Sequence, residues 1–264
     1  MKASLTLLGT GGAMGTPVIG CHCPVCRSPE PRNQRLRPSA LLTVGNKKLL
    51  IDAGPDVRQQ LLRSGVDAID GLVLTHAHYD HTAGLDELRI FSWEQGNPVP
   101  CLLSNETLDE LRKRFYYLFE QSRAFGSFAT RFVFQTFPGD RGEIEFCGVP
   151  FRFLSFEQGG MQVNGFRFGE LAYISDIREH ADSVYEDLKG IRKLIVSAAR
   201  FDETPFHFTV EEAVGFSTLV GAQETWLTHM GHEIDSTKSA EFLPAGVTLG
   251  YDGLEIPFDL RKHG

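Results

Sequence analysis

Gly71-Leu72-Val73-Leu74-Thr75-His76-Ala77-His78-Tyr79-Asp80-His81 is the stretch from which the fold and the chemistry of this chain are best inferred. An apolar, strand-like run leads directly into three histidines and one aspartate. Packing does not require so many ligand groups in one loop, and neutral imidazole and carboxylate are the usual protein ligands of zinc, iron and manganese. The stretch therefore predicts a metal centre at the end of a strand.

The size and charge of the chain limit its class. Its 264 residues, 42% of them hydrophobic, can bury the core of one large α/β domain or two small ones. The net charge of −8 argues against nucleic acid or an anionic membrane as partner, but a small anionic substrate fits beside bound dications. No apolar run reaches the roughly 20 residues of a membrane span, and the start reads as a strand entering a glycine loop, so we expect a cytoplasmic protein.

Short apolar strands alternate with helix-like stretches, which is typical of an α/β protein. Strands are expected at Ser4–Leu8, Ser39–Val44, Lys48–Asp52, Gly71–Thr75, Val99–Leu103, Val149–Phe156, Leu171–Ser175, Lys193–Ser197 and Glu224–Thr228. Helices are expected at Asp56–Ser64, Asn105–Gln121, Glu179–Lys189 and Thr209–Gly221. The aromatic-rich stretch Phe115–Phe137 is interpreted as a packed helix and strand, with a cap over a site as the alternative.

Four residues of ligand type each end an apolar strand: Asp52, His76, Asp176 and His229. Active sites of α/β proteins form where strand ends and loops meet at one edge of a sheet. Chance is a poor explanation for four separate strands that each end in such a residue. We therefore expect these four side chains to meet at one site.

Cys21-His22-Cys23-Pro24-Val25-Cys26 contains three thiols in one short segment. A Cys-x-x-Cys pair alone occurs in redox motifs and in zinc sites, and the third cysteine favours zinc. A closed structural zinc site needs a fourth ligand, for which His22 and His232 are the candidates. The two other cysteines, Cys101 and Cys147, lie in apolar strand-like contexts and are expected in the core.

Thr75–His81 resembles the Thr-His-x-His-x-Asp-His signature of the metallo-β-lactamase-fold hydrolases. Leu50–Gly54 resembles the upstream motif of that superfamily, Ser175-Asp176 its bridging aspartate, and Thr228-His229 its last histidine. The order and spacing of these motifs run through nearly the whole chain. The resemblance implies a four-layer αββα sandwich, formed by a single hydrolase domain over residues 1–264, with two metal ions.

The resemblance also implies which side chains hold the ions. The implied ligands of one or two Zn²⁺ or Mn²⁺ ions are His76, His78, Asp80, His81, Asp176 and His229. The first two histidines would bind one ion, Asp80 and the last two histidines would bind the other, and Asp176 would bridge both. Asp52 would steady the ligand loop through hydrogen bonds.

One histidine that the family supplies as a ligand is missing. No histidine lies between His81 and His180, and counting back from Gly165 puts Gln158 in the expected place. A neutral amide is a weak ligand for zinc, although the neighbouring Glu157 offers a carboxylate instead. We therefore predict that the ion on the first two histidines of the motif is held more weakly than the other.

The cysteine segment narrows the resemblance. The glycine-rich Gly9–Ala13 followed by Cys-x-Cys-x-x-Cys is similar to the branch that contains the cyclic phosphodiesterase of the carbon–phosphorus lyase pathway. That branch has a structural Zn²⁺, which makes residues 21–26 a zinc-knuckle-like segment. The ligands that this implies are Cys21, Cys23, Cys26 and His232. A related pyrroloquinoline quinone biosynthesis protein has a similar cysteine cluster, so the branch leaves the substrate open.

The branch implies a function. His207 stands before a predicted helix, and the resemblance implies that it protonates the leaving group, with Asp80 as the second catalytic candidate. We expect a metal-dependent hydrolase of a small phosphodiester, cyclic or linear, and the resemblance to the branch implies a homodimer. The alternatives are hydrolysis of a thioester, lactone or lactam, RNA processing, and metal binding or transport without catalysis.

Overall fold

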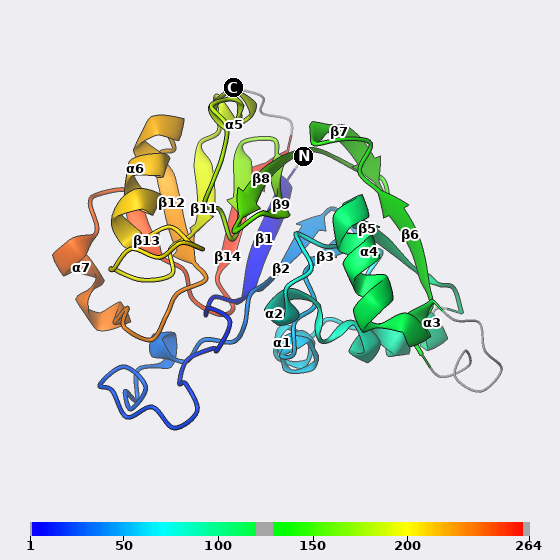
Figure 1. The fold of residues 1–264 in the computed structure, drawn as a ribbon, viewed down its shortest axis with the longest axis horizontal. Coiled ribbons are helices and arrows are strands. Elements are labelled where there is room, and N and C mark those ends of the chain that lie inside the picture. Colours follow the sequence, from blue (N-terminus) through cyan, green and yellow to red (C-terminus); the bar gives the residue numbers. More distant parts are fainter. Residues whose placement is uncertain (1, 95, 120–128, 261–264) are drawn as a thin grey trace.

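The computed structural model describes residues 2–94, 96–119 and 129–260, in which two seven-stranded sheets face each other (Figure 1). The first sheet, in the order β14-β1-β2-β3-β4-β5-β6, consists of Glu255–Asp259, Lys2–Gly9, Ser39–Val44, Lys47–Ile51, Gly71–Val73, Val99–Leu103 and Phe132–Thr136. The second, in the order β13-β12-β11-β10-β9-β8-β7, consists of Val247–Leu249, Glu224–Thr228, Lys193–Ser197, Leu171–Ile174, Met161–Phe168, Val149–Gln158 and Arg141–Phe146.

Helices cover the outer face of each sheet (Figure 1). On the first sheet these are α1, α3 and α4, at Val57–Ser64, Arg89–Glu94 and Asn105–Arg114, while the short α2, Tyr79–Thr82, follows β4. On the second they are α5, α6 and α7, at Ser183–Leu188, Val210–Val220 and Ser239–Phe242. One buried apolar cluster fills the space between the sheets, and two others lie between each sheet and its helices. The predicted four-layer αββα sandwich is confirmed.

Strand β3 shows how the sequence produces these layers. Successive side chains of a strand point to opposite faces of the sheet. Leu49 and Ile51 therefore pack into the core between the sheets, and Leu50 packs into the core beneath the helices. Burying each such side chain stabilises the fold by about 1.5–3 kcal/mol. A strand buried on both faces must be a continuous apolar run, and this run ends where the chain reaches the site.

Two predicted helices have different ends in the structure. The helix expected at Asn105–Gln121 ends at Arg114, because Phe115 leaves the helical region and packs with Leu118 and Phe119 against the helix-side core. The helix expected at Glu179–Lys189 is shorter, at Ser183–Leu188. Residues 120–128 of the aromatic-rich stretch lie outside the described residues, and β6 occupies its second part.

Helix α6 begins where its sequence predicts. The Thr209 hydroxyl accepts a hydrogen bond from the Glu212 backbone, and the Glu212 carboxylate accepts one from the Thr209 backbone. This capping box fixes the start of the helix, and it therefore fixes the path of His207, two residues earlier. Among the described helices, none is long and apolar enough to cross a membrane.

Candidate metal centre

The predicted ligand residues lie at the ends of β3, β4, β10 and β12. Three of them, Asp52, Asp176 and His229, have φ angles of 61°, 57° and 57°. In the described part of the chain, Cys147 is the one other non-glycine residue with positive φ. A backbone held in this region costs roughly 1–3 kcal/mol per residue and is concentrated at functional sites. Strain in the backbone therefore marks this edge of the two sheets as the functional one.

The loop from His76 to His81 crosses very close to the chain that follows β3. A Cβ atom on Gly54 would lie 1.9 Å from the carbonyl oxygen of Asp80, and one on Gly84 would lie 2.1 Å from the carbonyl oxygen of Gly54. The Ala53 N–H donates to the His81 carbonyl over 2.8 Å. These close approaches need glycine at both positions, and they hold the ligand loop against the end of β3.

Four buried side chains meet there and are called the four-ligand cluster: Asp80, His81, Asp176 and His229. Nε2 of His229 lies 3.2 Å from Oδ2 of Asp80 and 3.0 Å from Oδ1 of Asp176. Nε2 of His81 lies 3.4 Å from Oδ2 of Asp80 and 3.3 Å from Oδ2 of Asp176. Two imidazoles and two carboxylates therefore direct ligand atoms into one small volume.

Asp52 holds the ring of His81 from behind. Oδ2 of Asp52 lies 2.7 Å from Nδ1 of His81 and accepts a 2.8 Å hydrogen bond from the Thr75 hydroxyl. Oδ1 of Asp52 accepts a 2.8 Å hydrogen bond from the Thr75 backbone N–H. A carboxylate on one ring nitrogen fixes the orientation of a ligating histidine. Nε2 of His81 consequently faces the rest of the cluster.

The other two histidines of the motif are called the histidine pair, and fewer charged groups surround them. Nε2 of His76 lies 2.9 Å from Nδ1 of His78, and Nδ1 of His76 lies 2.9 Å from the Thr75 hydroxyl. Gln158, at the end of β8, places its Nε2 3.2 Å from Oδ1 of Asp176. Oε1 of Gln158 is buried and has no hydrogen-bond partner within the described residues. An amide, not an imidazole, is the side chain that approaches Asp176 from β8.

His207 approaches the same cluster from the loop before α6. Its Nδ1 lies 3.4 Å from Oδ1 of Asp176, and its ring centre lies 4.8 Å from that of His229. Nε2 of Gln158 lies 2.9 Å from one ring nitrogen of His207 and 3.4 Å from the other. Two such similar distances place the amide over the face of the ring. The ring edge of His207 is therefore left to contact other groups.

The three clustered cysteines meet a histidine from the far end of the chain. Nδ1 of His232 lies 3.3 Å, 3.4 Å and 3.6 Å from Sγ of Cys21, Cys23 and Cys26. A tetrahedral zinc with Zn–S of about 2.3 Å and Zn–N of about 2.0 Å would separate sulfur from nitrogen by about 3.5 Å. The observed spacing fits such an ion. His232, and not the exposed His22, lies with the thiols.

Comparison with known proteins identifies the family. The sequence model of the β-lactamase superfamily domain matches residues 47–230, which include the whole four-ligand cluster. The chain belongs to the β-lactamase superfamily. A solved superfamily structure, described as a new diphosphatase from the PhnP family, is 35% identical with a TM-score of 0.89, and the match covers 98% of each chain. The protein is thus a metallo-β-lactamase-fold hydrolase of the PhnP-like branch, which confirms the branch expected from the cysteine motif.

Two further comparisons differ in how much of the relative is matched and in sequence identity. An octanoyltransferase of Porphyromonas gingivalis is 35% identical over 267 residues, which cover 96% of this chain and 51% of that protein. The present chain therefore spans about half the length of that relative. Zn²⁺-bound PqqB from Methylobacterium extorquens has a TM-score of 0.77 at 19% identity, with 96% and 99% of the two chains covered, and shows the shared fold.

The charges of the four-ligand cluster suit a divalent cation. Burial opposes ionisation of Asp80 and Asp176, but the neighbouring imidazoles outweigh it and hold the pKa of both carboxyl groups well below their usual range. Burial would also lower the pKa of His81, but the surrounding carboxylates outweigh it and hold that pKa well above its usual value. The two ionised carboxylates create a negative field that favours a cation at the two rings, whether a proton or a metal ion. Two carboxylates and two imidazoles form the type of ligand set that binds zinc or manganese.

The histidine pair has a different electrostatic character. Burial is the largest cause that lowers the pKa of His76 well below its usual value, and it also lowers the pKa of His78. Both rings are therefore neutral, which is the form that binds metal. The nearest carboxylate on this side is the shared Asp176, so less negative charge is available to hold a second cation.

The cysteine cluster also fits a metal ion in its chemistry. The Cys26 backbone N–H is the largest influence on Cys23, and it lowers the pKa of that thiol to about 6 despite burial. Burial raises the pKa of the Cys26 thiol to about 11. One thiol is thus already ionised near neutral pH, and thiolate is the form that binds zinc.

The sequence analysis did not predict the positioning role of three residues: Thr75 and Gly54, which lie within the quoted motifs, and Gly84. Thr75 bonds Asp52 and His76, and the two glycines admit the ligand loop. The two glycines could have been found from the sequence, because glycines on both sides of a ligand motif indicate close backbone approach. None of the three has ligand chemistry of its own, so a search for metal-binding residue types passes over them.

Proposed function

We propose that the protein hydrolyses a small phosphodiester, cyclic or linear, at the four-ligand cluster and the adjoining histidine pair. The observation that carries the proposal is the convergence of two carboxylates and two imidazoles at separations of 3.0–3.4 Å. The 35% identity to a PhnP-family diphosphatase over 98% of the chain supports phosphorus as the reacting centre.

The residues present fit a pair of divalent ions that share Asp176. The four-ligand cluster would hold one ion, and His76 and His78 would hold the other. Such ions, when bound, activate water as a nucleophile and stabilise negative charge on the phosphoryl oxygens. The protein fixes the ligands in advance, because Asp52 orients His81 and the surrounding residues are buried. Asp80, one of the two catalytic candidates, contributes here as a ligand.

His207 is the proposed proton donor to the leaving oxygen. Burial is the largest cause that lowers its pKa to about 4, so the ring is neutral near pH 7 before substrate binds. An anionic phosphate beside the ring would raise this pKa, because an opposite charge stabilises the protonated form. His207→Ala should lose turnover of alkyl diesters while metal content stays constant. Unchanged turnover of these poor leaving groups would refute the role.

Hydrolysis of bis-p-nitrophenyl phosphate tests the proposed activity. Protein loaded with Mn²⁺ or Zn²⁺ should release p-nitrophenol, and His78→Ala should lower the rate by about 10²-fold because a metal ligand is lost. His180→Ala is the matched control, because it also removes a histidine, but one whose ring packs against Tyr185 and Phe216. If metal-loaded protein cleaves no diester or ester, the proposal fails and a metal-binding role without catalysis replaces it.

The relative named octanoyltransferase favours a second candidate, hydrolysis of a thioester or another acyl ester. That similarity covers 96% of this chain, although the chain covers only 51% of the relative. The same ligand set can serve attack on a carbonyl carbon. Comparison of kcat/KM for an octanoyl thioester and for bis-p-nitrophenyl phosphate separates the two candidates. Faster hydrolysis of the thioester would replace the first proposal by the second.

A further inference from the structure

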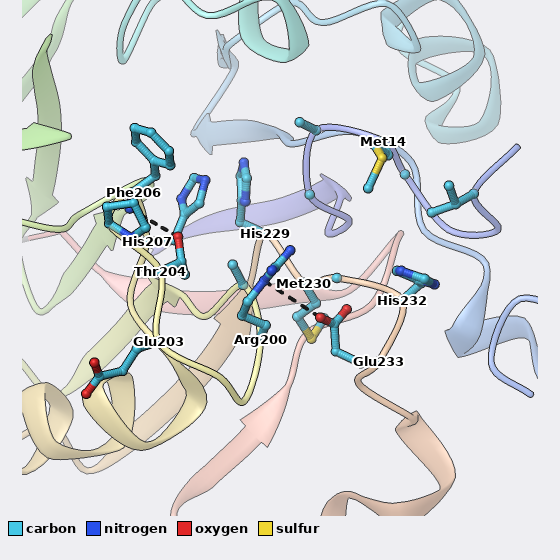
Figure 2. A pocket seen from close by; sticks show the side chains of 17 residues that line it. Met14, Arg200, Glu203, Thr204, Phe206, His207, His229, Met230, His232 and Glu233 are labelled. Atoms are coloured by element: carbon cyan, nitrogen blue, oxygen red, sulfur yellow. Dashed lines mark hydrogen bonds and ion pairs between the residues drawn. The ribbon is translucent and has the colours of Figure 1, made fainter. Parts of the chain in front are cut away.

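A cavity of about 440 Å³ adjoins the candidate centre (Figure 2). It is lined by the loop after β1, by two segments between β11 and α6, and by the residues that follow β12. Small-molecule sites typically measure about 300–1,000 Å³. His207 and His229 form part of its wall, so a molecule reacting at the centre would extend into this cavity.

Large apolar side chains form much of the cavity wall. Met14 and Phe206 lie on either side of His229 (Figure 2), and they are 60% and 53% exposed. Val18 and Met230 also line the cavity. Exposed apolar groups gathered beside a site mark a binding surface rather than part of the core.

The Phe206 side chain is held in place before any ligand binds. A Cβ atom on Gly159 would lie 3.0 Å from two carbons of the Phe206 ring, so the ring packs directly on the turn between β8 and β9. The Phe206 backbone N–H donates a 3.1 Å hydrogen bond to the Thr204 hydroxyl. A ring that already packs on the protein on one side loses less conformational entropy when a ligand contacts its other side.

The charged groups of the cavity do not favour a second anion. Nε of Arg200 lies 3.7 Å from Oε1 of Glu233, as the dashed line in Figure 2 marks. Glu203 also lines the cavity. The guanidinium is therefore paired with one carboxylate, and the cavity lining has two glutamates against one arginine, which does not favour an anionic substituent.

We infer that this cavity binds an uncharged, apolar substituent of the substrate, aryl or alkyl, attached through the oxygen that leaves phosphorus. The inference rests on the proposed function, which places the phosphate group at the metal ligands. The proposed proton donor, His207, lies between the two regions, so the substituent in the cavity is that of the leaving group. The substrate class is accordingly a phosphate ester with an apolar leaving alcohol.

Binding of phosphonates to the metal-loaded protein tests the inference by calorimetry. The probes are methylphosphonate, n-butylphosphonate, phenylphosphonate and phosphonoacetate, which vary the substituent at a constant anionic head. Butyl or phenyl should bind about tenfold more tightly than methyl, because additional apolar surface is buried. The comparison of the butyl and phenyl probes shows whether the cavity prefers a chain or a ring.

Two variants locate the effect. Phe206→Ala and Met14→Ala should each reduce the phenyl-to-methyl affinity ratio by about threefold or more, because each removes part of the apolar wall. Leu219→Ala, at a 70% exposed leucine of α6 that does not line the cavity, should leave the ratio unchanged.

Four outcomes would overturn the inference. If neither the butyl nor the phenyl probe binds more tightly than the methyl probe, or if the affinity ratios are equal in wild type and both cavity variants, the cavity takes no apolar group. Tightest binding of phosphonoacetate would assign the cavity to a second anion. If no phosphonate binds to protein that retains its metal, the proposed phosphate site fails, and the assignment of the cavity fails with it.

Discussion

The two sides of the candidate centre share Asp176 but differ in how completely the chain builds them. The four-ligand cluster brings two carboxylates and two imidazoles together, and Asp52 fixes one of the rings from behind. The histidine pair has a hydroxyl behind it, and Gln158 contributes a neutral amide. Two sites with the same number of histidines can therefore differ in how tightly they bind a cation. Ionised carboxylates and second-layer hydrogen bonds determine how tightly each side holds a cation.

The largest expected effect separates the two sides directly. His229→Ala should abolish the tightly held ion and lower kcat/KM by about 10³-fold or more, because the charge stabilisation supplied by that ion is lost. His78→Ala should remove the weaker ion and leave the tight one in place. Metal analysis after dialysis, together with diester kinetics, measures both. Equal metal loss in the two variants would contradict the proposed difference in metal affinity between the two sides.

A smaller effect is expected from restoring the missing imidazole. Gln158→His should tighten the ion on the histidine pair by about 10–100-fold, because a ligand that suits zinc replaces a weak one. Gln158→Met, which keeps a similar volume and has no amide, should give no such gain. Metal titration followed by calorimetry reports the two affinities separately. Two ions held equally tightly by the wild-type protein would contradict the prediction.

The smallest expected effect on catalysis comes from a change at the cysteine cluster, which tests whether that cluster binds a zinc ion. Cys23→Ser should lose one zinc and lower the melting temperature, while the metal of the four-ligand cluster is retained; Cys147→Ser, outside the cysteine cluster, is the control. Because the Cys23 thiol has a pKa lowered to about 6, its thiolate is lost as the pH falls through that value, and zinc affinity falls with it. Full zinc retention in Cys23→Ser would remove this site from the count.

Local sequence patterns predicted an α/β protein and many of its strands, and the resemblance to the metallo-β-lactamase-fold hydrolases implied the four layers. Four of the expected strands, at Ser39–Val44, Val99–Leu103, Lys193–Ser197 and Glu224–Thr228, have the observed bounds. Apolar residues form the centre of each of these strands, as buried strands require, and in all but Val99–Leu103 polar residues stand at one or both ends. The abrupt change from apolar residues to Asp52 or His229 indicated the ends of the strands at which the candidate site lies.

Strand β9, Met161–Phe168, shows why other elements were missed. Asn164 and Arg167 are buried within it and interrupt the apolar pattern. The Arg167 guanidinium donates 2.9 Å hydrogen bonds to the carbonyl oxygens of Asp187 and Lys189, near the end of α5. Such partners satisfy a buried polar group, but they are distant in sequence. Propensity and periodicity carry no information about them.

The cysteine cluster illustrates the same limit for a site. Spacing within residues 21–26 predicted zinc, but the residues alone left both His22 and His232 as candidates for the fourth ligand. The choice depends on the loop after β12 returning to the N-terminal segment, where Arg35 donates hydrogen bonds to the carbonyl oxygens of Gly231 and Ile234. Only the assembled fold places the histidine beside the thiols.

The positive φ angles of Asp52, Asp176 and His229 restrict how this sequence can drift. Aspartate, asparagine, histidine and glycine are the residues that tolerate this backbone best, whereas β-branched residues do not. Metal binding and the backbone conformation therefore favour nearly the same few residue types at these positions. A descendant freed from catalysis should still carry Asp, Asn or Gly at these positions, so a preserved aspartate there would not by itself reveal a working enzyme. Loss of function would be visible first at His76 and His78, where the backbone imposes no such restriction.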